Sequence, residues 1–237
     1  MLQVESMEAG YGELQVLRKI NFSVKKGELI VILGPNGHGK STLLKTICGL
    51  VKSNTGSIKF KGKEISQLPI DKIVEMGLVY VAEERELFPE MTVLENLKLG
   101  AFNINTRKEE SDNLRRVFSL FPKLSDMKTR IVSGLSGGEA KMLAIGRGIM
   151  SNAELLALDE PSLGLAPIVR NEVITTIGEI NKRGIGGTTI ILVEQNIPQV
   201  FDIANQIYLM EEGQFAFSGD KKEALENDMM KEVFLGM

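Results

Sequence analysis

A glycine-rich loop between an apolar run and a helical pattern constrains this chain more than any other feature. The segment from Gly34 to Ser41, G-P-N-G-H-G-K-S, fits the pattern G-x-x-x-x-G-K-[ST]. It follows the apolar run 29–33 and opens a helical pattern over 40–50, which is the context of a phosphate-binding loop. Glycines allow the backbone N–H groups to surround phosphates, and the helix N-terminus adds a positive dipole. A ligand-free strand-to-helix turn is the structural alternative, and the context favours nucleotide binding.

Further apolar runs extend this unit to an α/β fold. Buried strands are expected at 78–81, 155–158 and 189–193, because each run leads directly into a polar or glycine-rich turn, as strands of a parallel sheet do. Helical patterns follow at 139–150 and 167–183. This alternation of strands and helices is typical of α/β proteins.

The remaining segments predict two additions to that core. Short runs at 4–7, 20–24 and 57–60 have polar or turn-forming flanks and indicate an antiparallel β patch. The stretch 91–150 is mostly helical in pattern and has few strand signals. We expect one domain over 1–237, with a nucleotide-binding core and β patch at about 1–88 and 152–237 and a helical subdomain at about 89–151.

Composition excludes several classes of protein. The 237 residues carry 28 basic and 31 acidic side chains, and the net charge of -3 argues against a strongly basic nucleic-acid binder. One cysteine and one histidine exclude an internal disulfide and zinc sites built from several thiolates or imidazoles. Neither a signal peptide nor an apolar run near the ~20 residues of a membrane span is visible. We therefore expect a soluble, cytoplasmic chain.

Two acidic residues directly follow the run 155–158. Asp159 could hold Mg²⁺ beside the phosphate loop, and Glu160 could orient or deprotonate an attacking water. Alone, the pair would be an acidic turn after a buried strand. Together with Lys40, which would reach the β- and γ-phosphates, and Ser41, which would ligate Mg²⁺, it predicts ATP chemistry.

The sequence Leu-Ser-Gly-Gly-Glu from Leu135 to Glu139 precedes another helical pattern. Ser136 is a good N-cap, and Glu139 three residues later completes a capping box. A glycine-flanked helix start is also an anion site, so both interpretations stand.

These three motifs, in this order and over essentially the whole chain, resemble the ATP-binding-cassette (ABC) ATPases. The resemblance implies a RecA-like phosphate-loop core with an antiparallel β patch and a helical subdomain, and it implies ATP and Mg²⁺ as ligands. Ser136, Gly137 and Gly138 would then contact the γ-phosphate held by an opposite subunit, in a head-to-tail dimer of the same or different cassettes. The nucleotide-binding residues implied in the chain's own site are Tyr11, which would stack on adenine, and Gly34, Pro35, Asn36, Gly37, His38, Gly39, Lys40, Ser41 and Thr42.

Segments 81–97, 160–167 and 192–196 resemble the LivF-type cassette of branched-chain amino-acid importers. This implies separate permease subunits, an indirect link to a periplasmic or extracellular solute-binding protein, and a position on the inner face of the cell membrane. Related cassettes serve amide or urea uptake, which keeps the solute open. A regulatory cassette is a further alternative, and the retained Lys40, Asp159 and Glu160 count against it. Cassettes of DNA repair place long coiled coils between the motifs, and the 96 residues from Lys40 to Ser136 leave no room for them. Cassettes of translation differ as well, because they carry two cassettes in one chain.

Several positions depart from the wider family. Glu83 replaces the usual glutamine, and with Ser41 and Asp159 it completes the implied metal site. Gln195 replaces the usual histidine, and an amide can hydrogen-bond a phosphate oxygen or water but cannot accept a proton at neutral pH. Catalysis would then rest on Glu160 as base, with Lys40 and Gln195 assisting. The other departures are Ala166 and the pair Ala140 and Lys141, which follows the Leu-Ser-Gly-Gly-Glu signature.

The segment 83–97 is the expected contact surface for a permease helix. Phe88, Met91 and Val93 offer apolar contacts, and charged residues flank them. Arg85 is the charged residue whose reversal should uncouple transport from ATP hydrolysis.

Overall fold

The protein is described by a computed structural model that covers residues 1–84, 86–102, 104–183, 188–195, 198–228 and 230–231. Within these ranges the strands form a four-stranded sheet of order β2-β1-β4-β5 and a six-stranded sheet of order β10-β9-β3-β8-β7-β6. The strands are β1 (Leu2–Tyr11), β2 (Leu14–Val24), β3 (Leu29–Leu33), β4 (Ser53–Phe60), β5 (Lys63–Glu64), β6 (Leu78–Val81), β7 (Leu155–Asp159), β8 (Thr189–Glu194), β9 (Gln206–Glu211) and β10 (Gln214–Gly219).

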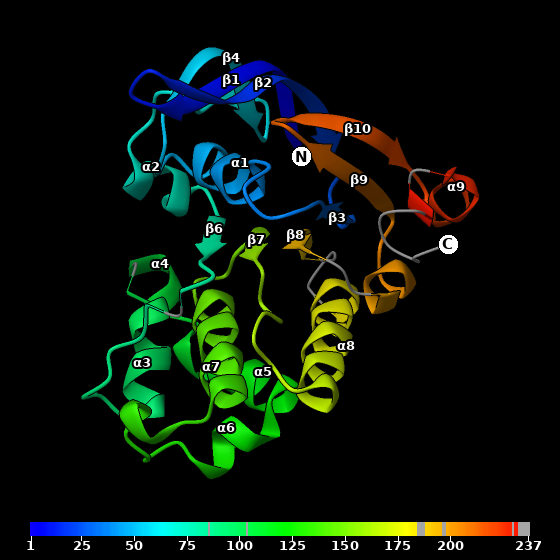
Figure 1. Ribbon diagram of the computed structural model, residues 1–237. Helices are drawn as coiled ribbons and strands as arrows, with labels where there is room; N and C mark the ends of the chain where they lie inside the picture. Colours follow the sequence, from blue (N-terminus) through cyan, green and yellow to red (C-terminus); the bar gives the residue numbers. More distant parts are fainter. Residues whose placement is uncertain (85, 103, 184–187, 196–197, 229, 232–237) are drawn as a thin grey trace.

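Helices cover both faces of the six-stranded sheet (Figure 1). The helix α1 lies between the two sheets, whereas α7 and α8 lie on the opposite face with the other helices of the middle segment. The helices are α1 (Lys40–Ile47), α2 (Ile70–Glu75), α3 (Val93–Gly100), α4 (Ile104–Arg107), α5 (Glu110–Leu120), α6 (Pro122–Asp126), α7 (Gly137–Met150), α8 (Pro167–Arg183) and α9 (Lys221–Glu226), with 3₁₀ turns η1 (Val132–Gly134) and η2 (Pro198–Asp202).

The strand β3 shows why the larger sheet is apolar on both faces. Leu29, Val31 and Leu33 belong to the core on the side of α7 and α8. Ile30 and Ile32 belong to a second core, which α1 and the antiparallel sheet complete. Successive side chains of a strand point to opposite faces, so a strand between two layers must be apolar throughout.

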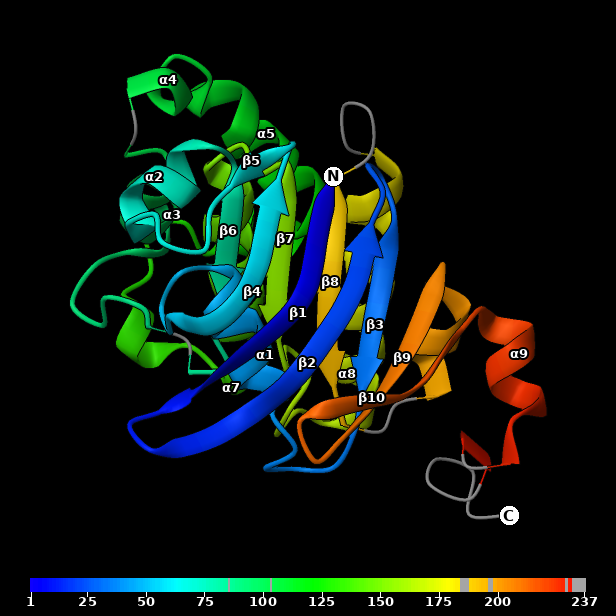
Figure 2. The same ribbon diagram turned by 90° about the horizontal axis from the view of Figure 1, so that it is seen from above.

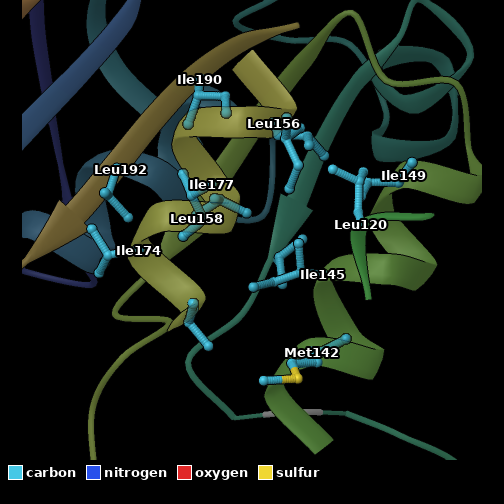
Figure 3. Packing of buried hydrophobic residues seen from close by; sticks show 14 of the residues in the cluster. Leu120, Met142, Ile145, Ile149, Leu156, Leu158, Ile174, Ile177, Ile190 and Leu192 are labelled. Carbon is cyan, nitrogen blue, oxygen red and sulfur yellow. The ribbon is translucent and has the colours of Figure 1, made fainter. Parts of the chain in front are cut away.

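Figure 3 shows the first of these cores from close by. Side chains of α7 and α8 meet those of the neighbouring strands β7 and β8, and all of them are buried. The labelled residues are Leu120 of α5, Met142, Ile145 and Ile149 of α7, Leu156 and Leu158 of β7, Ile174 and Ile177 of α8, and Ile190 and Leu192 of β8. This packing fixes the position of α7 against the sheet.

The antiparallel sheet extends over the face of the six-stranded sheet on which α1 lies. Figure 2 shows β1, β2 and β4 crossing above the six-stranded sheet. Strand β1 pairs with β2 and β4 in antiparallel register, interrupted by bulges. Leu43, Leu44 and Ile47 of α1 are buried in the core beneath it. The phosphate loop and its helix are therefore held between two sheets.

The expected architecture, an α/β core with an antiparallel β patch and a helical subdomain, is confirmed. The helices α3 to α7 follow one another in sequence between β6 and β7. The helix expected at 40–50 ends earlier, at Ile47, and Gly49 follows with a φ of 78°. Left-handed backbone of this kind commonly ends a helix. None of the helices in the described ranges has the length and apolar composition needed to cross a membrane.

The strands β9 and β10 were not expected. Strand β9 pairs in parallel with β3, and β10 pairs with β9 in antiparallel register at the edge of the sheet. The side chains of β10 alternate between exposed and less exposed positions, which is the period-two signal of an edge strand. That alternation was available in the sequence 214–219, but it is short and weakly apolar.

Candidate active site

Four loops meet at one edge of the six-stranded sheet because the strands that precede them are parallel. Strand β3 pairs in parallel with β8, β8 with β7, and β7 with β6. Leu33 lies opposite Glu194, and Asp159 lies opposite Val193, so the carboxyl ends are level. Ligands of open α/β sheets bind at this edge.

The phosphate loop takes its shape from glycines in positions that other residues cannot occupy. A Cβ at Gly34 would collide with the carbonyl oxygen of Met210 on β9. Gly39 has a φ of 102° and is the residue that caps α1. Lys40 is thus the first residue of the helix, where backbone N–H groups lack helical partners and attract anions.

Lys40 is buried, with 4% of its surface exposed, and its ammonium has two partners. Nζ donates to the carbonyl oxygen of Pro35 at 3.0 Å and forms an ion pair with Oε1 of Glu160 at 3.3 Å. A buried ion pair must repay the loss of hydration of both charges, so each charge depends on the other. A nucleotide phosphate would offer Lys40 an alternative anion.

Asp159 is held by two hydroxyl groups. Ser41 Oγ donates to Oδ1 at 3.0 Å, and Tyr80 OH donates to Oδ2 at 2.7 Å. Burial raises the pKa of Asp159, whereas these two hydrogen bonds act to lower it. Burial and the nearby Asp159 raise the pKa of Tyr80 above its ordinary value, so the phenol remains a donor. Ser41 and Asp159 supply hard oxygens of the kind that Mg²⁺ prefers.

Glu160 is fixed through its backbone and its side chain. Its φ of 43° lies in the left-handed region, which a residue with a side chain occupies only where neighbouring contacts hold it. Its N–H donates to the carbonyl oxygen of Val193 at 3.0 Å. Oε2 accepts a hydrogen bond from Nε2 of Gln195 at 2.6 Å, so the carboxylate lies between Lys40 and Gln195.

A pocket of about 410 Å³ brings most of the predicted nucleotide-binding and catalytic residues together, whereas Gly34, Pro35, His38 and Asp159 are outside the set that lines it. Glu83, in the loop after β6, lines this pocket together with residues of the phosphate loop. His38 does not line the pocket. Its Nδ1 accepts a hydrogen bond from the N–H of Glu212, in the turn between β9 and β10, at 3.2 Å. The predicted residues that line the pocket are Tyr11, Asn36, Gly37, Gly39, Lys40, Ser41, Thr42, Glu83, Glu160 and Gln195.

The signature residues Ser136, Gly137 and Gly138 lie at the start of α7, outside the set that lines this pocket. Ser136 caps the helix: its N–H donates to Oε2 of Glu139 at 2.7 Å, and its Oγ accepts from the N–H of Glu139 at 3.4 Å. A Cβ at Gly138 would press against Val169 of α8. The capping interpretation is therefore correct, and a role in binding the γ-phosphate of another subunit stays a prediction.

Three residues at this edge escaped the sequence analysis or had no role in it: Tyr80, Lys141 and Glu194. Lys141 Nζ donates to the carbonyl oxygens of Glu83 and Glu160. Glu194 is buried, and its Oε1 accepts a hydrogen bond from the N–H of Ser162 at 3.0 Å. Burial raises the pKa of Glu194 to about 7. No sequence pattern marks these positions, although Glu194 and Lys141 are charged residues within apolar surroundings.

The segment 83–97 contributes to a second hollow, of about 340 Å³, between β6, α3 and α7. Phe88 and Phe102 line it and are exposed, and Arg147 donates to the carbonyl oxygen of Glu86 at 2.8 Å. The expectation that Val93 offers a surface contact is wrong. Val93 is the first residue of α3 and is fully buried in the core. Arg85 lies outside the described residues.

Comparisons with known proteins agree on one family. A family model described as ABC transporter matches residues 17–163. The chain is 38% identical to the high-affinity branched-chain amino acid transport ATP-binding protein BraG of Pseudomonas aeruginosa, over 100% of both chains. It is 35% identical to the probable branched-chain amino acid transport ATP-binding protein LivF of Archaeoglobus fulgidus, over 100% of this chain and 99% of that one. A crystal structure of an ABC transporter's ATP-binding cassette in its ADP conformation is 29% identical, with a TM-score of 0.83 over 100% of this chain and 99% of that one.

Proposed function

Because the chain belongs to the ABC transporter family, as an ATP-binding cassette and an ATPase, we propose that it hydrolyses Mg²⁺-ATP to drive uptake of branched-chain amino acids. The observation that carries the chemistry is the convergence of Lys40, Ser41, Asp159 and Glu160 at one sheet edge, joined by direct contacts. Each group has a role that hydrolysis of a phosphoanhydride requires.

ATP would lie in the 410 Å³ pocket with its phosphates at the start of α1. Tyr11 is half exposed at the rim of this pocket, where its ring is available to stack on adenine. The oxygens of Ser41 and of Asp159, which Ser41 contacts, would hold Mg²⁺ together with Glu83, which lines the pocket as Ser41 does. Bound Mg²⁺ would neutralise charge that develops on the phosphate oxygens.

The contact between Lys40 and Glu160 suggests how nucleotide binding prepares the base. In the structure the ammonium of Lys40 is the electrostatic partner of Oε1 of Glu160. Phosphate oxygens would take over Lys40, which leaves Glu160 with the hydrogen bond from Gln195. The carboxylate would then be free to accept a proton from water.

The proposed solute follows from the relatives. BraG and LivF are both named as ATP-binding proteins of branched-chain amino-acid transport, and both match this chain from end to end. Contacts with the solute would lie in a permease and a solute-binding protein. The same proposal places the chain in the cytoplasm, peripherally on the inner face of the cell membrane.

Two surfaces support the proposed partners. The 340 Å³ hollow between β6, α3 and α7 presents exposed Phe88 and Phe102 beside Arg147, which suits an amphipathic permease helix. Ile168, 83% exposed at the start of α8, and Leu163, on the loop after Glu160, are apolar side chains at the surface. They suit the head-to-tail contact with a second cassette, in which the signature turn, Ser136 to Gly138, would close over the other subunit's ATP.

The test is uptake in the native cell. Deleting the gene should abolish high-affinity uptake of leucine, isoleucine and valine, and the parent chain should restore it. The Glu160→Gln variant should be produced at the parent level and should not restore uptake. Urea and short amides serve as control solutes. Loss of urea or amide uptake with normal leucine uptake would contradict the proposed solute while leaving the ATPase assignment intact.

A further inference from the structure

Lys141 lies on α7, beside the pocket, and has no role in the chemistry proposed above. We infer that Lys141 is a positioning residue, whose ammonium holds the backbone of Glu160 in place and connects it to the start of α7. The inference rests on the proposed function, because it requires Glu160 to be the base that activates water.

The environment of Lys141 is unusual for a lysine. Only 4% of its surface is exposed. Its Nζ donates to the carbonyl oxygen of Glu83 at 2.6 Å and to that of Glu160 at 3.2 Å. A buried ammonium is unfavourable unless hydrogen bonds replace its lost hydration, and hydrogen bonds from a charged donor are stronger than neutral ones. The two carbonyl groups therefore bind this ammonium strongly.

Both carbonyl groups belong to loops that leave neighbouring strands. Glu83 follows β6, and Glu160 follows β7, which pairs with β6 in parallel. One ammonium on α7 thus joins two strand ends at the edge where the pocket forms. Glu83 lines the pocket, so its loop is held there by the same contact.

The backbone of Glu160 needs such support. Its φ of 43° is unfavourable for a residue with a side chain. On one side, its N–H donates to the carbonyl oxygen of Val193 on β8 at 3.0 Å. On the other side, its own carbonyl oxygen accepts from Lys141. A turn of this peptide would move the carboxylate away from Lys40 and Gln195, so Lys141 helps to set the direction in which the carboxylate points.

The position of Lys141 along α7 gives this contact a further consequence. The helix begins at Gly137, immediately after Ser136, and Lys141 lies about one turn further on. The signature turn and the ammonium therefore move together as parts of one helix. A subunit or nucleotide that displaces the start of α7 would displace the ammonium and, through it, the backbone of Glu160.

A purely structural lysine would give a different result from a positioning residue. Structural damage lowers the fraction of folded protein, so nucleotide binding and turnover fall together. Loss of a positioning contact lowers kcat and leaves ATP affinity unchanged, because Lys40 and the phosphate loop still bind the phosphates. The ratio of these two effects separates the models.

The experiment uses the purified full chain and three variants. Lys141→Met removes the donors and keeps an unbranched apolar side chain, and Lys141→Gln keeps a neutral N–H donor. Lys128→Met, at an exposed lysine after α6, is the matched control. Steady-state kcat with Mg²⁺-ATP, ATP affinity by fluorescence titration and Tm are measured for each. We expect Lys141→Met to lower kcat by about tenfold or more, with ATP affinity within about twofold of the parent. The kcat of Lys141→Gln should lie between those of Lys141→Met and the parent, and Lys128→Met should have the kcat of the parent.

A Lys141→Met variant that is folded and turns over at the parent rate would overturn the inference. Should Lys141→Met fail to fold, the same comparison on Lys141→Gln decides: reduced kcat at unchanged affinity supports the inference, and parent kcat overturns it. The Glu160→Gln variant, measured alongside, separates the two proposals. If Glu160→Gln hydrolyses ATP at the parent rate, the proposed function fails and this inference falls with it. If Glu160→Gln is inactive while Lys141→Met is fully active, only the role of Lys141 is wrong.

Discussion

The pocket at the strand ends and the start of α7 differ in how their polar groups are satisfied. At the strand ends, Lys40, Asp159 and Glu160 are buried, and each contacts residues from other elements of the fold. At the start of α7, Ser136 is exposed, and the two hydrogen bonds of its capping box both return to Glu139 in the same turn.

The difference shows what one chain can assemble by itself. Parallel strands bring several carboxyl ends to one edge, so a site at this edge can be completed within the chain. A helix N-terminus attracts anions, but an exposed one acts on whatever approaches from outside. The pocket should therefore bind nucleotide in the isolated chain, whereas the start of α7 should contribute only when a second molecule is present.

The Glu160→Gln variant tests this division with the largest expected effect. The amide keeps the size of the side chain but cannot accept the proton, so kcat should fall by roughly 10²- to 10⁴-fold. ATP affinity should remain, and gel filtration with ATP and Mg²⁺ should show a dimer. Adding Ser136→Glu should abolish the dimer by charge repulsion with phosphate and leave the single chain's ATP affinity intact. A dimer that survives Ser136→Glu would contradict the proposed role of the signature turn. The Glu172→Gln variant, at a half-buried acid on α8 that pairs with Lys123 at 2.8 Å, is the control.

The Lys40→Ala variant should lower ATP affinity by about 100-fold, because the phosphates lose a buried charge-assisted partner. It also leaves the buried Glu160 carboxylate without its cation, so Tm should fall. The Lys40→Ala/Glu160→Gln double variant should regain Tm but not affinity. Fluorescence titration and thermal unfolding measure the two effects, with Lys52→Ala as the exposed control. Unchanged ATP affinity in Lys40→Ala would refute the assignment of the pocket.

The Gln195→Ala variant should lower kcat by about tenfold or more, since a lost hydrogen bond to a charged group costs about 1.5–3 kcal/mol. The partner of its Nε2 is Oε2 of Glu160, so Gln195 orients the carboxylate. ADP affinity should barely change, and Gln195→His should retain activity. Steady-state ATPase measurements test this role. If Gln195 were only a spacer without a part in catalysis, Gln195→Ala would match the parent in kcat.

The pH dependence of stability should have opposite signs in the two regions. The pKa of Glu194 is raised to about 7 by burial, so the folded state binds its proton more tightly than the unfolded state does. The free energy of unfolding should therefore decrease as pH rises from about 4.5 to 7, by about 2–3 kcal/mol relative to Glu194→Gln.

At the start of α7, the hydrogen bond from the N–H of Ser136 lowers the pKa of Glu139. The stability that this carboxylate contributes is present above its unfolded pKa and is lost as pH falls. Solvent screening makes the effect smaller than at Glu194. Urea unfolding of the parent, Glu194→Gln and Glu139→Gln between about pH 3 and 8 measures both effects, because the Glu139 contribution is lost below about pH 4.5. Slopes of the same sign would show that the two carboxyl groups do not differ as their surroundings imply.

The sequence alone determined the parts of this protein that depend on local pattern. The phosphate loop, the strands that end at Asp159 and Glu160 and the capping box at Ser136 are each written in contiguous residues, and the motif order identified the family. Apolar runs also predicted that strands such as β3 are buried on both faces, because such a strand has no polar side.

Only the tertiary structure decided which distant residues meet. The register of β6 beside β7 places Tyr80 against Asp159, and the packing of α7 on the sheet places the ammonium of Lys141 on the carbonyl oxygen of Glu160. Packing also buried Val93, which the sequence had suggested as a surface contact. A linear pattern gives the periodicity of a helix or strand but not its neighbour, because contacts between elements depend on the relative position of whole layers.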